Sequence, residues 1–214
     1  MSLEHDEAIE KYILEHIDEE GEVLKALNRD AHVNLMRPRM LSGHLQGRLL
    51  KMFCRMMQPK YILEIGTYTA YATLCLAEGA ANDAEIHTIE VNDELEDFIK
   101  KHLHKTKLKD KIHLHIGDAM EIIPNLDCMF DLVFIDANKR VYTEYYNLIF
   151  DKVRPGGLII ADNTLWDGKV LETPKQGDRQ TIGIQHFNDM VAEDDRVEKV
   201  IIPLRDGLTL IWKK

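Results

Sequence analysis

Apolar positions in the first part of the chain recur at helical spacing. Residues 4–31 predict an amphipathic helix that is broken near Gly21, and Arg37-Pro38 interrupts the pattern again. Residues 44–57 predict a second amphipathic helix, whose cluster of methionines is typical of core packing. The chain therefore begins with a helical region that extends to about residue 58.

After Pro59, short apolar runs of strand type alternate with helical patterns. The predicted strands cover residues 61–65, 85–90, 111–116, 130–136, 157–162, 197–202 and 208–212. The predicted helices cover residues 69–78, with Gly79 as the terminating residue, 93–106, 142–150 and 181–191, and a short helix ends at residue 123.

This alternation predicts one α/β domain over residues 1–214. Right-handed crossovers give parallel strands with helices on both faces of the sheet. The last two strands are joined only by a short turn, so they must form an antiparallel hairpin. The fold class is therefore α/β, with a seven-stranded mixed sheet and one reversed strand at its end. Residues 164–180 form a long aperiodic stretch, which is typical of a functional lid or of flexible padding.

Composition narrows the classes of function. The net charge of −10 disfavours a phosphate-binding surface, although lysines around residues 100–111 keep a nucleic-acid partner open. The longest apolar runs are too short to span a bilayer, and the acidic N-terminus is unlike a signal peptide. Three widely spaced cysteines without a C-x-x-C motif fit reduced thiols in the cytoplasm.

Two predicted strands end on oxygen-bearing side chains. Asp136 closes one apolar run, and Asp162 and Asn163 close the next. If these strands are parallel neighbours, the three side chains meet at one edge of the sheet, where they would bind a hard cation. Lys139, just beyond Asp136, then indicates acid–base chemistry on an oxygen atom rather than a solvated surface lysine.

The first predicted strand leads into Gly66, at the crossover where doubly wound sheets bind ligands. The turn lacks the second glycine of dinucleotide-binding loops, which favours a ligand with a ribose and no phosphates. Glu90 ends the next strand, where an acid accepts hydrogen bonds from both ribose hydroxyls. Gly117-Asp118-Ala119 ends the third strand, where adenine contacts usually fall in this architecture.

Histidines are the other candidates for metal binding. His102 and His104 point apart on a helix, whereas His113 and His115 share one face of a strand. No carboxylate lies at matching spacing in the sequence. The pattern therefore favours surface or half-buried histidines over a histidine metal site.

Together these motifs resemble the class I S-adenosylmethionine-dependent, divalent-cation-dependent O-methyltransferases. The family includes catechol and caffeoyl-CoA O-methyltransferases and their small bacterial relatives. The resemblance extends from about Met40 to Lys213. The segments that carry it are LEIGTYT (63–69), TIE (88–90), FIDANK (134–139), RPGG (154–157), ADN (161–163) and DGL (206–208).

The resemblance implies a Rossmann-like methyltransferase domain that methylates a hydroxyl of a catechol-like small molecule, an aromatic diol. Residues 1–58 are expected to form part of the cofactor and substrate site, and the protein is expected to be a cytoplasmic homodimer with no membrane contact. The implied catalytic residues are Lys139 and Asp136, and the implied ligands of Mg²⁺, Mn²⁺ or Ca²⁺ are Asp136, Asp162 and Asn163. The implied residues at S-adenosylmethionine are Met40, Ser42, Glu64, Gly66, Thr67, Tyr68, Ala72, Glu90, Gly117, Asp118, Ala119 and Asp136.

Methyl transfer from a sulfonium to a phenolate removes charge, so a dry site favours it. A cation would stabilise the phenolate, and Lys139 would accept the proton if desolvation and the cation lower its pKa. Two alternatives stay open. One is methylation of a hydroxylated uridine in tRNA, and the other is a sensor that binds S-adenosylmethionine without catalysis.

Two positions depart from the usual sequence of the family. Ala70-Tyr71-Ala72 stands where the family usually has Gly-Tyr-Ser. The hydroxyl that helps hold the cofactor carboxylate is absent, so we expect weaker cofactor binding or a compensating backbone contact. Asn138 stands where an aspartate is frequent, at a position expected not to bind the metal directly.

Overall fold

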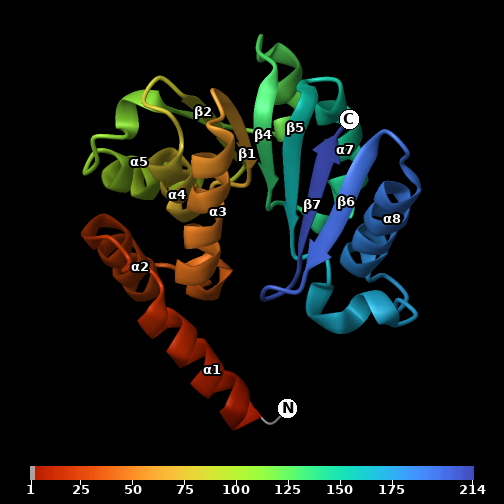
Figure 1. Cartoon of the computed structure of the whole chain (residues 1–214), viewed down its shortest axis with the longest axis horizontal. Coiled ribbons are helices and arrows are strands. Elements are labelled where there is room, and N and C mark those ends of the chain that lie inside the picture. Colours follow the sequence, from red (N-terminus) through yellow and green to blue (C-terminus); the bar gives the residue numbers. More distant parts are fainter. Residues whose placement is uncertain (1–2) are drawn as a thin grey trace.

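The computed structural model describes residues 3–214, so the first two residues of the predicted domain lie outside it. Helix α1 (Leu3–His16) projects from the body of the molecule, and α2 (Glu22–Asn34) and α3 (Gly43–Met57) follow (Figure 1). The break predicted near Gly21 is confirmed, since residues 17–21 separate the two helices α1 and α2. Within the described residues, none of the helices is long and apolar enough to cross a membrane.

A seven-stranded sheet lies at the centre, in the order β3-β2-β1-β4-β5-β7-β6. Its strands are β1 (Tyr61–Ile65), β2 (Glu85–Glu90), β3 (Ile112–Ile116), β4 (Phe130–Ile135), β5 (Val153–Asp162), β6 (Val197–Ile202) and β7 (Leu208–Lys213). β7 runs antiparallel to both β5 and β6, which confirms the predicted hairpin and the mixed sheet. The reversed strand lies inside the sheet, between β5 and β6, rather than at its end.

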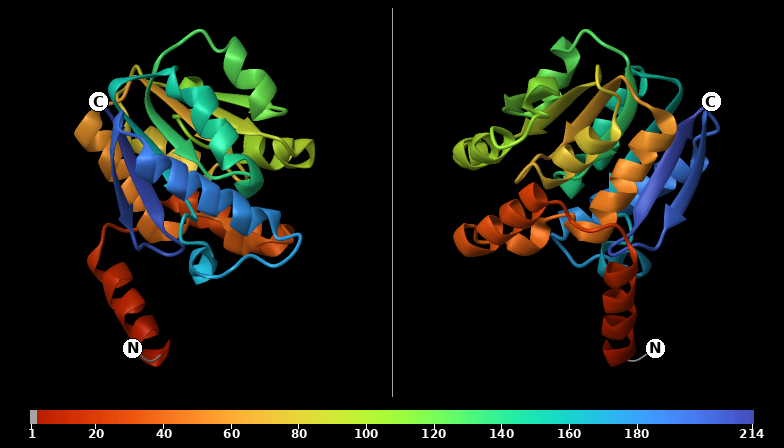
Figure 2. Two further views of the ribbon diagram at one scale, coloured as in Figure 1. Left: turned by 90° about the vertical axis from the view of Figure 1, so that its right-hand side faces the viewer. Right: turned by 60° about the vertical axis from the view of Figure 1, so that its left-hand side comes forward.

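Helices cover both faces of the sheet, as predicted (Figures 1 and 2). Helices α2, α3, α4 (Tyr71–Gly79) and α5 (Glu96–Leu103) pack on one face, and α6 (Ala119–Ile122), α7 (Tyr142–Phe150) and α8 (Arg179–Glu193) on the other. Short 3₁₀ helices complete the chain: η1 (Pro38–Met40), η2 (Asp93–Leu95), η3 (Lys109–Lys111), η4 (Ile123–Asn125), η5 (Lys139–Val141) and η6 (Trp166–Leu171).

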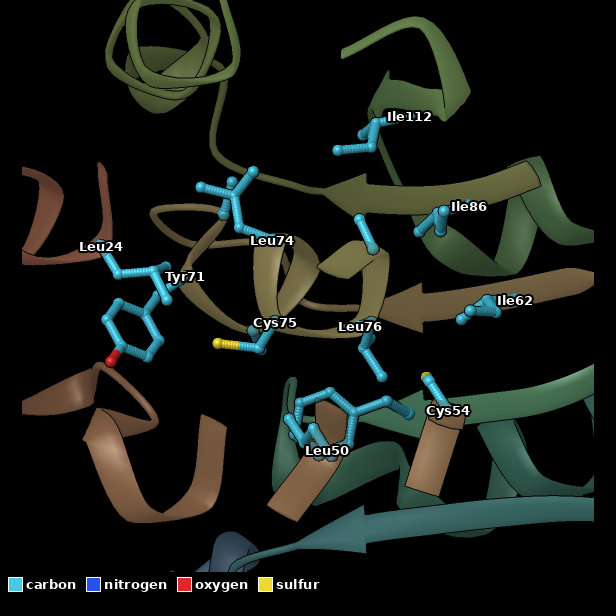
Figure 3. Close-up of a cluster of buried hydrophobic side chains, with 14 of the residues drawn as sticks. Leu24, Leu50, Cys54, Ile62, Tyr71, Leu74, Cys75, Leu76, Ile86 and Ile112 are labelled. Atoms are coloured by element: carbon cyan, nitrogen blue, oxygen red, sulfur yellow. The ribbon is translucent and has the colours of Figure 1, made fainter. Parts of the chain in front are cut away.

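Close contact between α3 and α4 anchors the N-terminal helices on the sheet. Leu50 and Cys54 of α3 are fully buried beside Leu76 of α4 (Figure 3). Gly79 is the last residue of α4, which confirms the predicted end of this helix, and it lies against α3. A Cβ atom there would lie only 2.2 Å from the carbonyl oxygen of Lys51, so glycine permits the close approach of the two helices.

Candidate active site

The carboxyl ends of β1 and β4 meet where the order of the strands reverses, the place at which open α/β sheets bind ligands. The chain leaves β1 through Gly66, whose φ is +99°. A Cβ atom at Gly66 would lie 2.0 Å from the carbonyl oxygen of Asp136. The Asp136 amide donates to the carbonyl of Ile65 over 2.9 Å. The turn after β1 and the end of β4 are therefore in direct backbone contact.

A pocket opens at this contact. It brings together most of the residues predicted for the methionine end of the cofactor, with Asp136 among them. Its lining is Met40, Leu41, Ser42, Gly66, Thr67, Tyr68, Thr69, Tyr71, Ala72, Phe134 and Asp136. The segment at Leu41 and Ser42 is held by the Arg205 guanidinium, which donates to both of their carbonyl oxygens. The N-terminal region thus forms one wall of the pocket.

Glu64 lies behind the pocket rather than in its lining. It is fully buried, and its Oε2 accepts hydrogen bonds from the hydroxyls of Thr73 and Thr88. Its Oε1 has no hydrogen-bond partner. Burial raises the pKa of Glu64 to about 8, and the charges of Asp136 and Glu90 add to the shift. A buried carboxyl oxygen without a donor fits a cationic ligand group.

Glu90 is buried at the end of β2, beside the first turn. Its Oε2 accepts from the amide of Tyr68 over 2.7 Å, and its Oε1 accepts from the amide of Asn92 over 2.9 Å. The carboxylate is therefore fixed by the backbone and keeps further lone pairs for other donors. The amide of Gly117 donates to the Glu90 carbonyl, so the segment predicted for adenine adjoins it. Asp118 caps α6 through a bond from the Met120 amide.

The predicted cation ligands do lie on parallel neighbours. Ile135 of β4 is in register with Ala161 of β5, so Asp136 and Asp162 follow at the same edge of the sheet. The Asp162 side chain is almost fully buried, and its Oδ1 accepts from the Asn163 amide over 2.7 Å. Burial raises the pKa of Asp162, and the negative charge of Asp136 raises it further. Two carboxylates in mutual repulsion fit a divalent cation with oxygen ligands.

Lys139 is buried at this edge rather than solvated. Its Nζ donates to Asp136 Oδ1 over 2.7 Å and lies 5.0 Å from the centre of the Tyr142 ring. Burial alone would lower the pKa of Lys139, as expected from the sequence. Its neighbours Tyr142 and Asp136 outweigh burial, so the net pKa shift is upward in the protein without a cation. The ammonium is therefore a charged partner of Asp136 in the protein alone.

Two positioning residues had no signal in the sequence. Gln46, buried on α3, donates from Nε2 to Asp162 Oδ2 over 2.6 Å. The Tyr142 hydroxyl lies 3.2 Å from the Ile135 carbonyl oxygen and 3.1 Å from that of Asp162, so it spans the ends of β4 and β5. We call the edge of the sheet that carries Asp136, Asp162 and Asn163 the acidic edge. These long-range contacts, made from two different helices, hold it in place.

The positions that depart from the family lie in this first turn. Ala70 adopts a left-handed conformation with φ of 68°, which suits the glycine usual at this position. Ala72 lines the pocket without offering a hydroxyl. The aperiodic segment 164–180 is tied to the turn between β6 and β7, because the Thr164 amide donates to the Gly207 carbonyl over 3.1 Å.

His102, His113 and His115 lie on α5 and β3, not on the elements that form this edge. His102 is fully buried and pairs with Asp30 of α2 over 2.7 Å, rather than lying at the surface or half-buried. His113 and His115 share one face of β3, as predicted, and His87 of β2 lies on the same face. Burial lowers the pKa of His87 to about 4, helped by its two histidine neighbours. Glu85 approaches His113 from β2, a carboxylate that spacing along the sequence could not reveal.

The sequence and the fold of this chain are similar to those of known proteins. The model of the O-methyltransferase family matches residues 14–214. A catechol O-methyltransferase from Niastella koreensis is 30% identical, over 95% of this chain and 96% of its own. Caffeoyl-CoA O-methyltransferase 5 from Nicotiana tabacum is 31% identical, over 98% of this chain and 92% of its own. The crystal structure of the O-methyltransferase TomG from Streptomyces achromogenes, in complex with SAM, is 29% identical with a TM-score of 0.93, over 100% of this chain and 99% of its own.

We predict that Gly66→Ala destabilises the protein by more than about 2 kcal/mol, because strain and overpacking each cost about 1–3 kcal/mol. Gly177→Ala is the matched control, since φ is also positive there (+90°) but no atom lies within 4 Å of the new Cβ. Urea unfolding of both variants measures the difference. Equal stability losses would show that the Gly66–Asp136 contact is not the constraint.

Proposed function

The chain belongs to the O-methyltransferase family, and from this premise we propose that it methylates one hydroxyl of a catechol-like small molecule, using S-adenosylmethionine and a divalent cation. One observation carries the proposal. Asp136 lines the pocket beside the Gly66 turn and also lies at the edge that holds Asp162 and the buried Lys139. The cofactor pocket and the acidic edge thus share Asp136. This arrangement suits transfer of a methyl group between two molecules that are held side by side.

S-adenosylmethionine supplies an electrophilic methyl group on a cationic sulfonium, and the charges around the pocket suit such a molecule. Glu64, Glu90 and Asp136 are close enough for their charges to interact. We assign the unpartnered Oε1 of Glu64 to the ammonium of the methionine end, and Glu90 to the ribose hydroxyls. Met40, Ser42, Thr67, Tyr68 and Ala72 would line the methionine end, in keeping with a contribution of residues 1–58 to the site. Gly117, Asp118 and Ala119 would flank the adenine.

Asp136, Asp162 and Asn163 would hold Mg²⁺, Mn²⁺ or Ca²⁺, and the bound cation would supply positive charge that favours an ionised acceptor hydroxyl. Gln46 would keep Asp162 in place, since it occupies Asp162 Oδ2. The residues fit the cation because burial and the negative charge of Asp136 raise the pKa of Asp162, and the ammonium of Lys139 opposes this shift only in part. The resemblance also implies a cytoplasmic homodimer, which stays a prediction.

Lys139 would handle the proton of the acceptor hydroxyl. Its Nζ is fixed by Asp136 and Tyr142, and only a small part of it reaches solvent. In this position the amine is directed to the pocket edge, where it can take a proton or remain as an ammonium beside the oxygen anion. The buried surroundings exclude water, which favours a reaction in which opposite charges cancel.

For the cofactor site, we predict that Glu90→Ala weakens binding of S-adenosylhomocysteine by about 1.5–3 kcal/mol, the range for hydrogen bonds to a charged group. Glu94→Ala, an exposed acid in the next turn, is the control and is expected to change nothing. Isothermal titration calorimetry measures both. Equal affinity of wild type and Glu90→Ala would remove Glu90 from the site.

For the metal, we predict that exhaustive EDTA treatment abolishes methylation of a catechol and that Mg²⁺ or Mn²⁺ restores it. Asp162→Asn should need a higher Mg²⁺ concentration for half-maximal rate, because one ligand charge is lost. Asp167→Asn, at an exposed position nearby, should behave as the wild type. Undiminished turnover after EDTA would contradict the proposed metal dependence.

For the proton transfer, we predict that Lys139→Ala lowers kcat by about 10²–10⁴-fold, the usual cost of losing a positioned acid–base group. Affinity for S-adenosylhomocysteine should stay nearly unchanged, since Lys139 is outside the pocket lining. Lys139→Arg retains a cation for Asp136 but cannot accept a proton, so it should remain impaired.

Steady-state assays with a catechol, its monophenol analogue and hydroxylated tRNA provide the measurement. The exposed Lys169→Ala variant serves as the control. Unimpaired turnover by Lys139→Ala would show that Lys139 does not transfer the proton. Faster methylation of tRNA than of catechol would show that tRNA, not a catechol, is the substrate.

A further inference from the structure

Four side chains with metal-binding atoms gather on one face of the sheet, at its β3 edge. His87 of β2 and His113 of β3 are directly opposite each other in the parallel register, and their rings stack with centroids 4.9 Å apart. Glu85 lies two positions before His87 and therefore on the same face. His115 completes the group, with its Nε2 3.1 Å from Nδ1 of His87.

We propose that Glu85, His87 and His113 form a binding site for one Zn²⁺ ion, separate from the site proposed at Asp136 and Asp162. One ligand atom from each of the three residues lies within 4.8 Å of the others. Two imidazoles and one carboxylate are a ligand set that zinc uses, with a fourth position left to water. The set is unlike the purely oxygen-bearing side chains at the acidic edge, which suit Mg²⁺.

The distances require a small closure of the site. Zinc bonds of about 2.0–2.2 Å place tetrahedral ligand atoms roughly 3.4 Å apart. Glu85 Oε2 and His113 Nε2 are 3.8 Å apart, already near this separation. Both side chains are 44% exposed, so they are free to rotate about their side-chain bonds and open to an entering ion. The pairing of β2 with β3 holds the backbone of the site in place.

His115 acts as a positioning residue for His87. A nitrogen-to-nitrogen distance of 3.1 Å between two neutral rings means that one ring donates to the other. Such a bond fixes the orientation and tautomer of a ligand histidine, as partners outside the coordination sphere commonly do. A bound ion would join β3, the edge strand, to β2. Along β2, Glu85 lies about 16 Å and His87 about 10 Å from Glu90, at about 3.3 Å per residue.

Zinc titration of metal-free protein in saturating Mg²⁺ tests the proposal, since Mg²⁺ occupies oxygen sites and binds imidazole poorly. We expect one Zn²⁺ per chain and a rise in Tm for the wild type. Loss of His115, a partner outside the coordination sphere, should weaken Zn²⁺ binding by roughly 10–100-fold in the His115→Ala variant. Loss of a direct ligand in His113→Ala or Glu85→Gln should weaken Zn²⁺ binding by at least as much. His104→Ala, an exposed histidine in the turn after α5, and Asp162→Asn should bind as the wild type.

Zinc X-ray absorption of the loaded wild type identifies the ligands. Scattering from two imidazole rings is expected, and it should persist in His115→Ala and fall to one ring in His113→Ala. The exposed position of His113 means that this variant should fold, which a thermal melt without zinc verifies. Unchanged stoichiometry and affinity in the His113→Ala and Glu85→Gln variants, or a spectrum without imidazole scattering, would overturn the proposal.

Discussion

The backbone contact between Gly66 and Asp136 determines the arrangement of the whole candidate site. The two residues leave adjacent parallel strands at the reversal of strand order, and a single Cβ atom at Gly66 would separate them. Because they touch, Asp136 of the acidic edge proposed for the cation lines the same pocket as the turn proposed for the cofactor. The distance between the two binding functions is therefore set by the sheet, not by flexible loops.

This arrangement also concentrates acidic side chains at the site. Glu64, Glu90, Asp136 and Asp162 crowd around the end of the sheet, and burial raises the pKa of Glu64 and of Asp162. Lys139 is the one lysine that pairs with this group among the described residues, through Asp136. An acidic, buried region of this kind is costly without ligands, which is why it suits a sulfonium compound and a divalent cation. Such stored repulsion is typical of functional sites rather than of a stable core.

Much of the sheet and its edge could be predicted from the sequence because the signals are local. Apolar runs that stop at Asp136, Asp162 and Glu90 mark strand ends, and alternation with helices fixes parallel pairing. The contact of Gln46 with Asp162 had no such signal, since it joins residues 116 positions apart. The upward pKa shift of Lys139 in the protein without a cation also had no sequence signal, because it depends on how closely Asp136 and Tyr142 approach the amine. Glu85 and His113 come together only through strand register.

In the proposed site, the acidic edge next to Gly66 holds a cation beside the bound cofactor. A crystal structure of the protein with Mn²⁺ and S-adenosylhomocysteine, with an anomalous map at the manganese edge, tests it directly. We expect one strong peak bounded by Asp136, Asp162 and Asn163, with the nucleoside in the pocket lined by Thr67 and Tyr68. A nucleoside bound there without any manganese peak at the acidic edge would contradict it.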